Sequence, residues 1–308
     1  MMTLLKNFFY KIFPITRSGI VLDRINKKVD QTLMINACTL INSIDYSLER
    51  KNFKDIEFSV FSQWGDDGII QYLIRKIDIP IKTFIEFGVE NYLESNTRFL
   101  LTHDNWSGLV IDSSEENIAY IKKDSISWKY ELQSIKAFID IDNINELISS
   151  AGFSGEIGIL SIDIDGNDYW VWKAIEVINP IIVIIEYNSI FGVERPITVP
   201  YKKDFIRSKE HFSNLYFGAS LPALCLLAEE KGYYFVGGDS HGVNAYFVKK
   251  NKIKNLLPIT LEEGYVSSKF TQSRDINGNL NHLYLKKQLE SIKGLDVINV
   301  ETKKTEQL

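Results

Sequence analysis

The sequence of 308 residues contains only two cysteines, Cys38 and Cys225, and they lie far apart. Two such cysteines cannot build a disulfide framework or a metal–thiolate site, so we expect a reducing compartment, the cytoplasm. The chain also has no excess of positive charge, because 35 Lys and Arg residues stand against 40 Asp and Glu residues, a net charge of −5. This balance argues against a nucleic-acid-binding protein, which needs basic groups to neutralise phosphates.

Long hydrophobic runs are missing as well, and we expect no transmembrane segment. Residues 1–13 are rich in apolar side chains, but Lys6 and Lys11 interrupt them and no signal-peptide cleavage site follows. They predict a short amphipathic helix that packs on the body or on a second subunit, or that lies in a membrane interface. A homodimer is therefore possible.

From residue 80 onward, short apolar runs alternate with stretches typical of helices. The apolar runs cover residues 83–89, 108–112, 131–138, 157–165 and 181–186, and the helical stretches cover 95–104, 115–123, 142–151 and 168–178. Runs this apolar suit strands that are buried on both faces of a parallel sheet. A helix at 220–231 and two further runs around a glycine-rich turn follow an irregular stretch. The pattern predicts an α/β fold with five parallel strands and an antiparallel edge hairpin.

Three regions are expected along the chain. Residues 1–57 form an N-terminal helical extension, in which apolar positions between residues 31 and 49 have helical spacing. Residues 58–250 form the α/β domain, and residues 251–308 form a C-terminal extension.

The glycine-rich phosphate loop of dinucleotide-binding proteins is absent from the end of the first strand. That strand ends in Glu86-Phe-Gly88, with one glycine where the dinucleotide fingerprint has three. Asp112 ends the second strand, where an acidic side chain can accept hydrogen bonds from both hydroxyls of a ribose. The pair predicts an adenosine ligand without phosphates, such as S-adenosylmethionine, with Glu86 and Gly88 near its amino-acid part. Gln63 either covers this cofactor or belongs to a helix cap, and Asp112 and Gly88 alternatively serve a cap and a turn.

Acidic and amide side chains follow the fourth and fifth strands. Asp163 and Asp165 are two residues apart, which places their side chains on one face of a strand, near Glu186 and Asn188. Converging carboxylates repel one another unless a cation or a proton intervenes, and oxygen ligands favour Mg²⁺ or Ca²⁺. We therefore expect Asp165, Glu186 and Asn188 as metal ligands. A metal-free site with Asp165 or Asp168 as general base, and a simple turn with a helix cap, are the alternatives.

His241 lies in the glycine-rich turn between the last two apolar runs, where packing does not demand a histidine. It is a candidate for the general base or for a contact with substrate. Solvent exposure without a role is the alternative.

Several segments resemble the FkbM-type class I methyltransferases and, more narrowly, bacterial sugar O-methyltransferases associated with capsule and lipopolysaccharide loci. These segments are Ser62-Gln63, Gly65-Asp66-Asp67-Gly68, Ile85-Glu86-Phe-Gly88-Val89, Asn96-Thr97, Trp106-Ser-Gly108-Leu-Val-Ile-Asp112, Leu160-Ser-Ile-Asp163-Ile-Asp165-Gly166-Asn167-Asp168 and Ile185-Glu186-Tyr187-Asn188. The resemblance implies a Rossmann-like class I methyltransferase fold, S-adenosylmethionine as methyl donor and a sugar hydroxyl as acceptor. It also implies Asn96, Ser113 and Asp163 as cofactor contacts.

The function expected from the sequence is methyl transfer to a hydroxyl of a nucleotide-linked sugar or of a surface-glycan precursor such as capsular polysaccharide. One alternative is a nicotinamide-dependent oxidoreductase on a related fold, which would need the missing glycine loop. The other is a non-catalytic binding module that keeps the fold.

Overall fold

The computed structural model describes residues 14–254, 256–269, 272–284 and 286–308, and the helix expected within residues 1–13 lies outside them. The described chain divides into two units, residues up to Ile44 and residues Asp45–Leu308. None of the helices in the described ranges combines the length and the hydrophobicity needed to cross a membrane.

The first unit contains one helix of 30 residues, α2, Pro14–Ser43. The expected helix, from residue 31 to 49, was therefore wrong at both ends. Its N-terminal part was missed because charged residues are interspersed there, although Val21, Ile25 and Val29 recur at every fourth position, which is helical spacing. The helix ends at Ser43, and a turn follows in which the Asp45 carboxylate accepts a hydrogen bond from the Ser47 backbone N–H at 2.9 Å.

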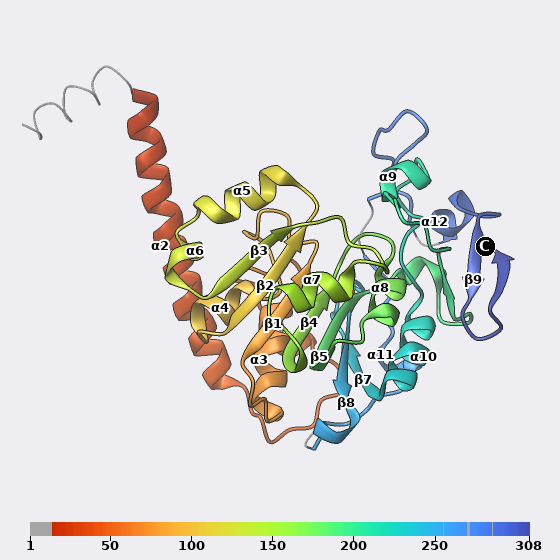
Figure 1. Cartoon of the computed structure of the whole chain (residues 1–308), viewed down its shortest axis with the longest axis horizontal. Helices are drawn as coiled ribbons and strands as arrows, with labels where there is room; N and C mark the ends of the chain where they lie inside the picture. Colours follow the sequence, from red (N-terminus) through yellow and green to blue (C-terminus); the bar gives the residue numbers. More distant parts are fainter. Residues whose placement is uncertain (1–13, 255, 270–271, 285) are drawn as a thin grey trace, which may run out of the picture. The chain divides into compact units, whose positions relative to one another are not determined.

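The second unit is built on a seven-stranded sheet with the order β3-β2-β1-β4-β5-β8-β7 (Figure 1). The strands are β1 Thr83–Phe87, β2 Ser107–Asp112, β3 Leu132–Lys136, β4 Gly155–Ile162, β5 Ile178–Glu186, β7 Tyr233–Gly238 and β8 Asn244–Lys249. The first five are parallel, and β8 runs antiparallel to both of its neighbours, β5 and β7. The five parallel strands and the antiparallel edge hairpin predicted from the sequence are confirmed, and the fold is that of the class I methyltransferases.

Helices lie on both faces of this sheet (Figure 1). They are α3 Asp66–Lys76, α4 Arg98–His103, α5 Glu115–Lys123, α6 Ile126–Lys129, α7 Ile144–Ser150, α8 Asp168–Ala174 and α10 Leu221–Lys231. Alternate strand residues such as Ile85, Leu109 and Val183 share one buried core with α7, α8 and α10. Because side chains alternate along a strand, Glu86 points to the opposite face.

The segment after β5 and the C-terminal residues form a second, smaller layer. β6 Ile197–Thr198 pairs with β9 Asp296–Asn299, which pairs with β10 Lys304–Gln307. The short helices η2 Ser189–Phe191, α9 Arg207–Glu210 and α12 Lys286–Ser291 complete the layer. Helix α11 Leu261–Gly264 packs instead on β7 of the main sheet and on α10, and η1 Lys54–Ile56 and η3 Lys250–Lys252 flank that sheet in sequence. The expected C-terminal extension thus pairs with the irregular stretch that follows the fifth strand.

Candidate functional site

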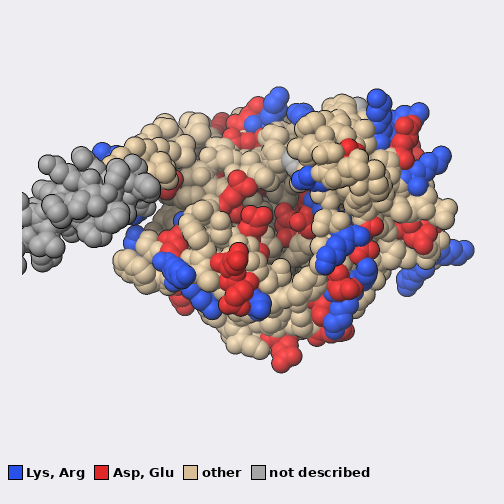
Figure 2. Space-filling model, turned by 90° about the horizontal axis from the view of Figure 1, so that it is seen from above, with Lys and Arg blue, Asp and Glu red and all other residues tan. Residues whose placement is uncertain are grey.

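A cavity of about 820 Å³ opens at the carboxyl ends of β1, β2, β4 and β5. Ligands bind outside this edge in open α/β sheets. Figure 2 shows a hollow on this face of the molecule, with acidic side chains gathered around it. The opposite wall comes from the second layer and includes Phe205, Arg207 and Arg274.

Gly88 follows directly after β1, lines the cavity and lies close to the residue that follows β4. Its φ is +72°, and a Cβ atom at this position would lie 1.6 Å from the carbonyl oxygen of Asp163. Its backbone N–H donates to the Ile111 carbonyl at 3.0 Å. Only glycine combines this backbone conformation with so close an approach, and the chain after β1 therefore turns directly over the cavity floor.

Asp112 ends β2 and lines the cavity as expected. Its Oδ2 accepts a hydrogen bond from the Glu90 N–H at 2.9 Å, and its Oδ1 accepts from the Ser114 N–H at 2.8 Å and from Asn117 Nδ2 at 3.2 Å. These contacts fix the orientation of the carboxylate and bind the loops after β1 and β2 to it. A carboxylate has about four lone-pair positions, so acceptor capacity remains for a ligand.

Glu86 lines the cavity too, but its carboxylate is occupied by the protein. It accepts from the backbone N–H groups of Asn96 at 2.8 Å and Thr97 at 3.1 Å and from the Thr97 hydroxyl at 2.5 Å. Burial raises the pKa of this carboxyl group, although these donors oppose the shift. These bonds hold the loop that begins α4, and the expected cofactor contact of Glu86 stays a prediction.

The other expected cofactor residues also line the cavity. They are Gln63, Asn96, Ser113 and Asp163. The Asn96 side chain is oriented by a hydrogen bond from its Nδ2 to the Ser161 hydroxyl at 3.2 Å. Gln63 and Ser113 are exposed, with side chains free to meet a ligand from the rim.

Phe138 is a cavity residue that the sequence did not single out. It lies with Ala137 and Ile139 just beyond β3, and 44% of its surface is exposed although it is a large aromatic residue. Asp112 pairs with Lys136 in the sheet register, so Phe138 follows two residues after the partner of Asp112. The signal in the sequence was an aromatic side chain at the end of a strand, which suits stacking of a planar ring.

Three carboxylates converge at the ends of β4 and β5. Asp163, Asp165 and Glu186 each offer one oxygen, and these oxygens all lie within 4.8 Å of one another. Burial first, and then the neighbouring carboxylates, raise the pKa values of Asp163 and Glu186 well above their usual range. Glu186 Oε2 is buried and has no hydrogen-bond partner in the described ranges. A cation or protons are needed to balance this cluster.

Two details of this cluster differ from the expectation. β4 ends at Ile162, and Asp165 has a left-handed φ of +56°, so a turn rather than a shared strand face brings Asp163 and Asp165 together. Asn188 does not join them, because its amide donates to the carbonyls of Leu215 and Phe217, both at 3.0 Å, and its oxygen accepts from a backbone N–H. A buried amide with all these partners is not available to a metal ion, and the expectation for Asn188 is corrected accordingly.

Arg207, on α9, is a charged residue of the cavity that sequence reasoning missed. Its Nη1 lies 2.5 Å from Asp165 Oδ1, and its guanidinium lies 3.6 Å from the centre of the Phe217 ring. Its Nε donates to the Asn214 carbonyl at 2.7 Å. The arginine contributes one positive charge against three carboxylates, and it leaves the acidic cluster with a surplus of negative charge when all three are ionised.

Asp168 does not reach the cavity and is fully buried at the start of α8. Its Oδ1 accepts from the Ile164 N–H at 2.8 Å, and its Oδ2 accepts from the Gly166 N–H at 2.9 Å. Burial raises its pKa to about 6. The structure thus gives Asp168 the role of holding the loop around Asp165, which corrects its expected role as general base.

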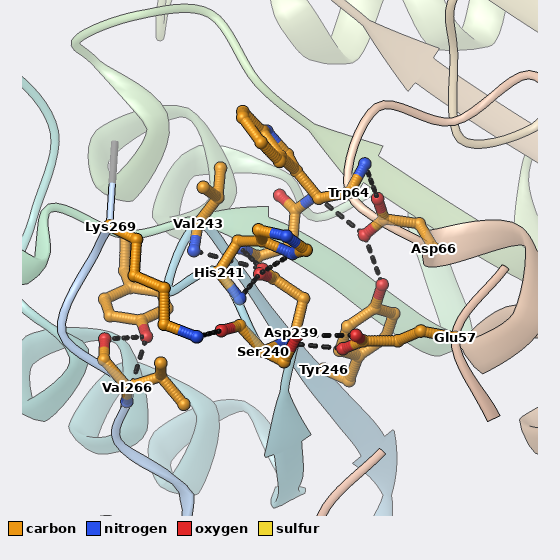
Figure 3. Close-up of polar contacts among 12 residues, drawn as sticks. Glu57, Trp64, Asp66, Asp239, Ser240, His241, Val243, Tyr246, Val266 and Lys269 are labelled. Atoms are coloured by element: carbon orange, nitrogen blue, oxygen red, sulfur yellow. Dashed lines mark hydrogen bonds and ion pairs between the residues drawn. The ribbon is translucent and has the colours of Figure 1, made fainter. Parts of the chain in front are cut away.

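His241 lies outside the cavity lining, in the turn between β7 and β8. Its ring packs against Trp64, with 4.9 Å between ring centres, and Trp64 lines the cavity (Figure 3). Its Nδ1 is 3.9 Å from Asp239 Oδ1 and has no hydrogen-bond partner in the described chain. His241 therefore packs on a wall residue and does not itself line the cavity, and its catalytic role stays a prediction.

The same turn is bonded to the segment before α3, which carries Trp64 (Figure 3). Ser240 donates through its N–H and its hydroxyl to the two oxygens of Glu57, each at 2.6 Å. Asp66, fully buried, accepts from Asn244 Nδ2 at 2.8 Å and from the Tyr246 hydroxyl. These bonds hold the segment from Glu57 to Asp66 against β8, beside the cavity.

Comparisons with known proteins found similarity only among solved structures, and it is low. No protein-family model and no curated protein matches the sequence. Among solved structures, the N-terminal domain of EvdMO1 with SAH bound is similar, with 10% identity, a TM-score of 0.38, and coverage of 59% of this chain and 79% of that one. An S-adenosylmethionine-dependent methyltransferase from Clostridium acetobutylicum has 11% identity, a TM-score of 0.38, and coverage of 68% and 93%. PKMT2 from Rickettsia typhi in complex with AdoHcy has 10% identity, a TM-score of 0.41, and coverage of 63% and 55%. Similarity of this extent transfers no activity.

Proposed function

We propose that this chain is an S-adenosylmethionine-dependent O-methyltransferase that acts on a sugar hydroxyl. The observation that carries the proposal is the position of Asp112, Gly88 and Asp163 at the ends of three neighbouring parallel strands, all lining one cavity. A cofactor with a nucleoside but no diphosphate fits this edge, because Asp112 offers a carboxylate and the first loop has no phosphate cradle.

The residues present suit each part of such a cofactor. Asp112 would accept hydrogen bonds from ribose hydroxyls, and the exposed ring of Phe138 would stack on the adenine. Gly88 leaves room for the amino-acid part of the cofactor, and Asp163 offers it a carboxyl group. S-adenosylmethionine, when bound, supplies a methyl group that its sulfonium has already activated.

The acidic cluster would act on the acceptor. Asp165 is 60% exposed at its side chain, whereas the Glu186 Oε2 atom is buried, so Asp165 is the carboxylate best placed to meet an incoming hydroxyl. It would take the hydroxyl proton, with Arg207 holding it in place. Alternatively, a divalent cation held by Asp163, Asp165 and Glu186 would bind the acceptor oxygen and lower its pKa.

Further parts of the proposal concern the acceptor and the setting. The acceptor is a nucleotide-linked sugar or a precursor of a surface glycan such as capsular polysaccharide, as the FkbM-type resemblance implies. The chain has only two cysteines, Cys38 and Cys225, far apart in sequence, which suits the reducing cytoplasm. A homodimer through the N-terminal region belongs to the same proposal. Rival functions are a binding module that keeps the fold and a nicotinamide-dependent oxidoreductase.

Substitution of Asp112 tests the proposal directly. We expect wild-type protein to bind S-adenosylhomocysteine in calorimetry, and Asp112→Asn to bind it about 10- to 100-fold more weakly, because hydrogen bonds to a charged group contribute roughly 1.5–3 kcal/mol. Asp142→Asn is the matched control, since Asp142 is an exposed partner of Lys203 outside the cavity. Melting temperatures of both variants report on folding.

Three results would contradict the proposal in different ways. Absence of any heat with the wild-type protein favours the binding-module rival, and binding of a nicotinamide dinucleotide in its place favours the oxidoreductase. Unchanged affinity in a folded Asp112→Asn variant removes Asp112 from the ribose site.

A further inference from the structure

Arg274 is a guanidinium in the cavity wall that no carboxylate neutralises. Arg98, Arg195 and Arg207 each pair with a carboxylate, whereas Arg274 has no such partner within the part of the chain that the structure describes. Its Nη1 donates to the Gly278 carbonyl at 2.9 Å, which fixes the side chain and leaves other N–H groups of its planar fork for a ligand. Arg274 is half-buried, so its positive charge is partly removed from water and would be stabilised by a bound anion.

The hairpin that carries Arg274 is internally bonded. Arg274 and Leu280 form an antiparallel bridge, and the Asn281 N–H donates to the Ser273 carbonyl at 3.0 Å. Asp275, next to Arg274, is used within the turn, where its Oδ1 accepts from the N–H groups of Asn277 and Asn279 at 2.9 Å. Arg274, Leu280 and, two residues later, His282 all line the cavity.

Arg274 and Arg207 are anchored to consecutive peptide groups of the second layer. The Arg274 N–H donates to the Ser213 carbonyl at 3.2 Å, and Arg207 Nε donates to the Asn214 carbonyl at 2.7 Å. Arg207 also forms an ion pair with Asp165, so its positive charge is balanced by the acidic cluster. The charge of Arg274 remains for something that enters the cavity.

Charge is therefore divided across the cavity. Asp163, Asp165 and Glu186 lie at the strand ends, whereas Arg274 belongs to the hairpin that is bonded to the second layer. A neutral sugar would offer the guanidinium of Arg274 hydroxyl oxygens as acceptors but no negative charge. A phosphate would be repelled by the acidic cluster but attracted by a planar fork that matches its oxygens.

We infer that the acceptor is a phosphorylated sugar whose phosphate or diphosphate binds Arg274, while its hydroxyl faces Asp165. This inference rests on the proposed function and selects, among its acceptors, those with an anionic group over neutral glycans. Gln272 and His282 line the same cavity, and their side chains are of types that can donate hydrogen bonds.

Calorimetry with simple anions tests the assignment on protein saturated with S-adenosylhomocysteine. The probes are inorganic pyrophosphate, glucose 1-phosphate and glucose, which separate a diphosphate from a monoester and both from the neutral sugar. We expect the phosphorylated probes to bind to wild-type protein and Arg274→Gln to weaken them at least tenfold. Arg274→Lys keeps the charge and should retain part of the affinity. Arg195→Gln is the control, because Arg195 pairs with Glu306 outside the cavity.

The outcomes separate this inference from the proposed function. Equal affinity of Arg274→Gln and wild type for the phosphorylated probes, or no binding of these probes to the wild type, overturns the inference while S-adenosylhomocysteine still binds. Tighter binding of glucose than of glucose 1-phosphate overturns it as well. Failure of S-adenosylhomocysteine to bind at all is instead a failure of the proposed function. Cofactor affinity should be the same in all three variants, which shows that each is folded.

Discussion

Asp67 shows what a single buried carboxylate does for the segment before the first strand. Its Oδ2 accepts hydrogen bonds from three consecutive backbone N–H groups, those of Val60 at 2.7 Å, Phe61 at 2.7 Å and Ser62 at 3.1 Å. Its Oδ1 is buried and has no partner among the described residues. Burial outweighs the three donors and raises its pKa to about 7. This residue thus holds the approach to Gln63 and Trp64 in the cavity wall.

The raised pKa of Asp67 has a defined effect on stability. A group that binds its proton more tightly when folded stabilises the protein fully below its unfolded pKa of about 4, and this contribution is lost as the pH rises through about 7. We expect the free energy of unfolding in urea to fall less between pH 4 and pH 7 in Asp67→Asn than in the wild type. Asp239 and Asp168 titrate in the same window in both proteins and cancel from the difference. Parallel pH profiles would show that Asp67 is not the group responsible.

At the scale of elements, the strands were predictable and the loops around them were not. Five strands and the edge hairpin followed from apolar runs, because a strand buried on both faces needs little more than β-branched residues. The acidic residues at the strand ends were also found, since the carboxyl ends of parallel strands meet at one edge. Asp168 and Asn188, however, are of residue types that can bind a metal or a ligand, but their side chains bond to backbone groups instead. Only the three-dimensional structure distinguishes these two roles.

The contact between Arg207 and Asp165 could not be predicted from the sequence. Arg207 meets Asp165 across 42 residues of chain, from a short helix inside an irregular stretch. Neither periodicity nor a local motif predicts such a contact, because it depends on how the second layer closes over the sheet. Arg274 and Phe138 escaped notice for the same reason.

The junction between β1 and β4 depends on the absence of a side chain at Gly88. We expect Gly88→Ala to lower stability by more than 1 kcal/mol and to abolish measurable binding of S-adenosylhomocysteine, because the added Cβ would lie 1.6 Å from the Asp163 carbonyl oxygen. Gly152→Ala is the matched control, since Gly152 has a similar φ of +86° but nothing within 4 Å of the added atom. Urea unfolding and calorimetry of both variants separate backbone strain from the clash. Equal effects in the two variants would contradict a close approach at Gly88.

At the scale of the whole molecule, the acidic cluster joins parts of the chain that fold as different layers. Asp163 and Asp165 follow β4, Glu186 ends β5, and Arg207 comes from the second layer. A ligand that binds all of these carboxylates would stabilise the folded state over the unfolded one, because the unfolded chain does not bring them together. A divalent cation should therefore affect the stability of the entire second unit as well as the reaction.

We expect Mg²⁺ or Mn²⁺ at about 100 times its dissociation constant to raise the melting temperature by about 5 °C, since such binding contributes roughly 2.7 kcal/mol. Glu186→Gln should lose most of this rise, because the buried oxygen without a partner belongs to Glu186. Glu176→Gln, an exposed change outside the cavity, should keep it. If the proposed reaction uses the cation, EDTA should abolish methyl transfer and added Mg²⁺ should restore it. Full turnover in EDTA, together with a melting temperature that does not change with the metal, would contradict a cation site. Asp165, held by Arg207, would then accept the proton of the acceptor without a cation.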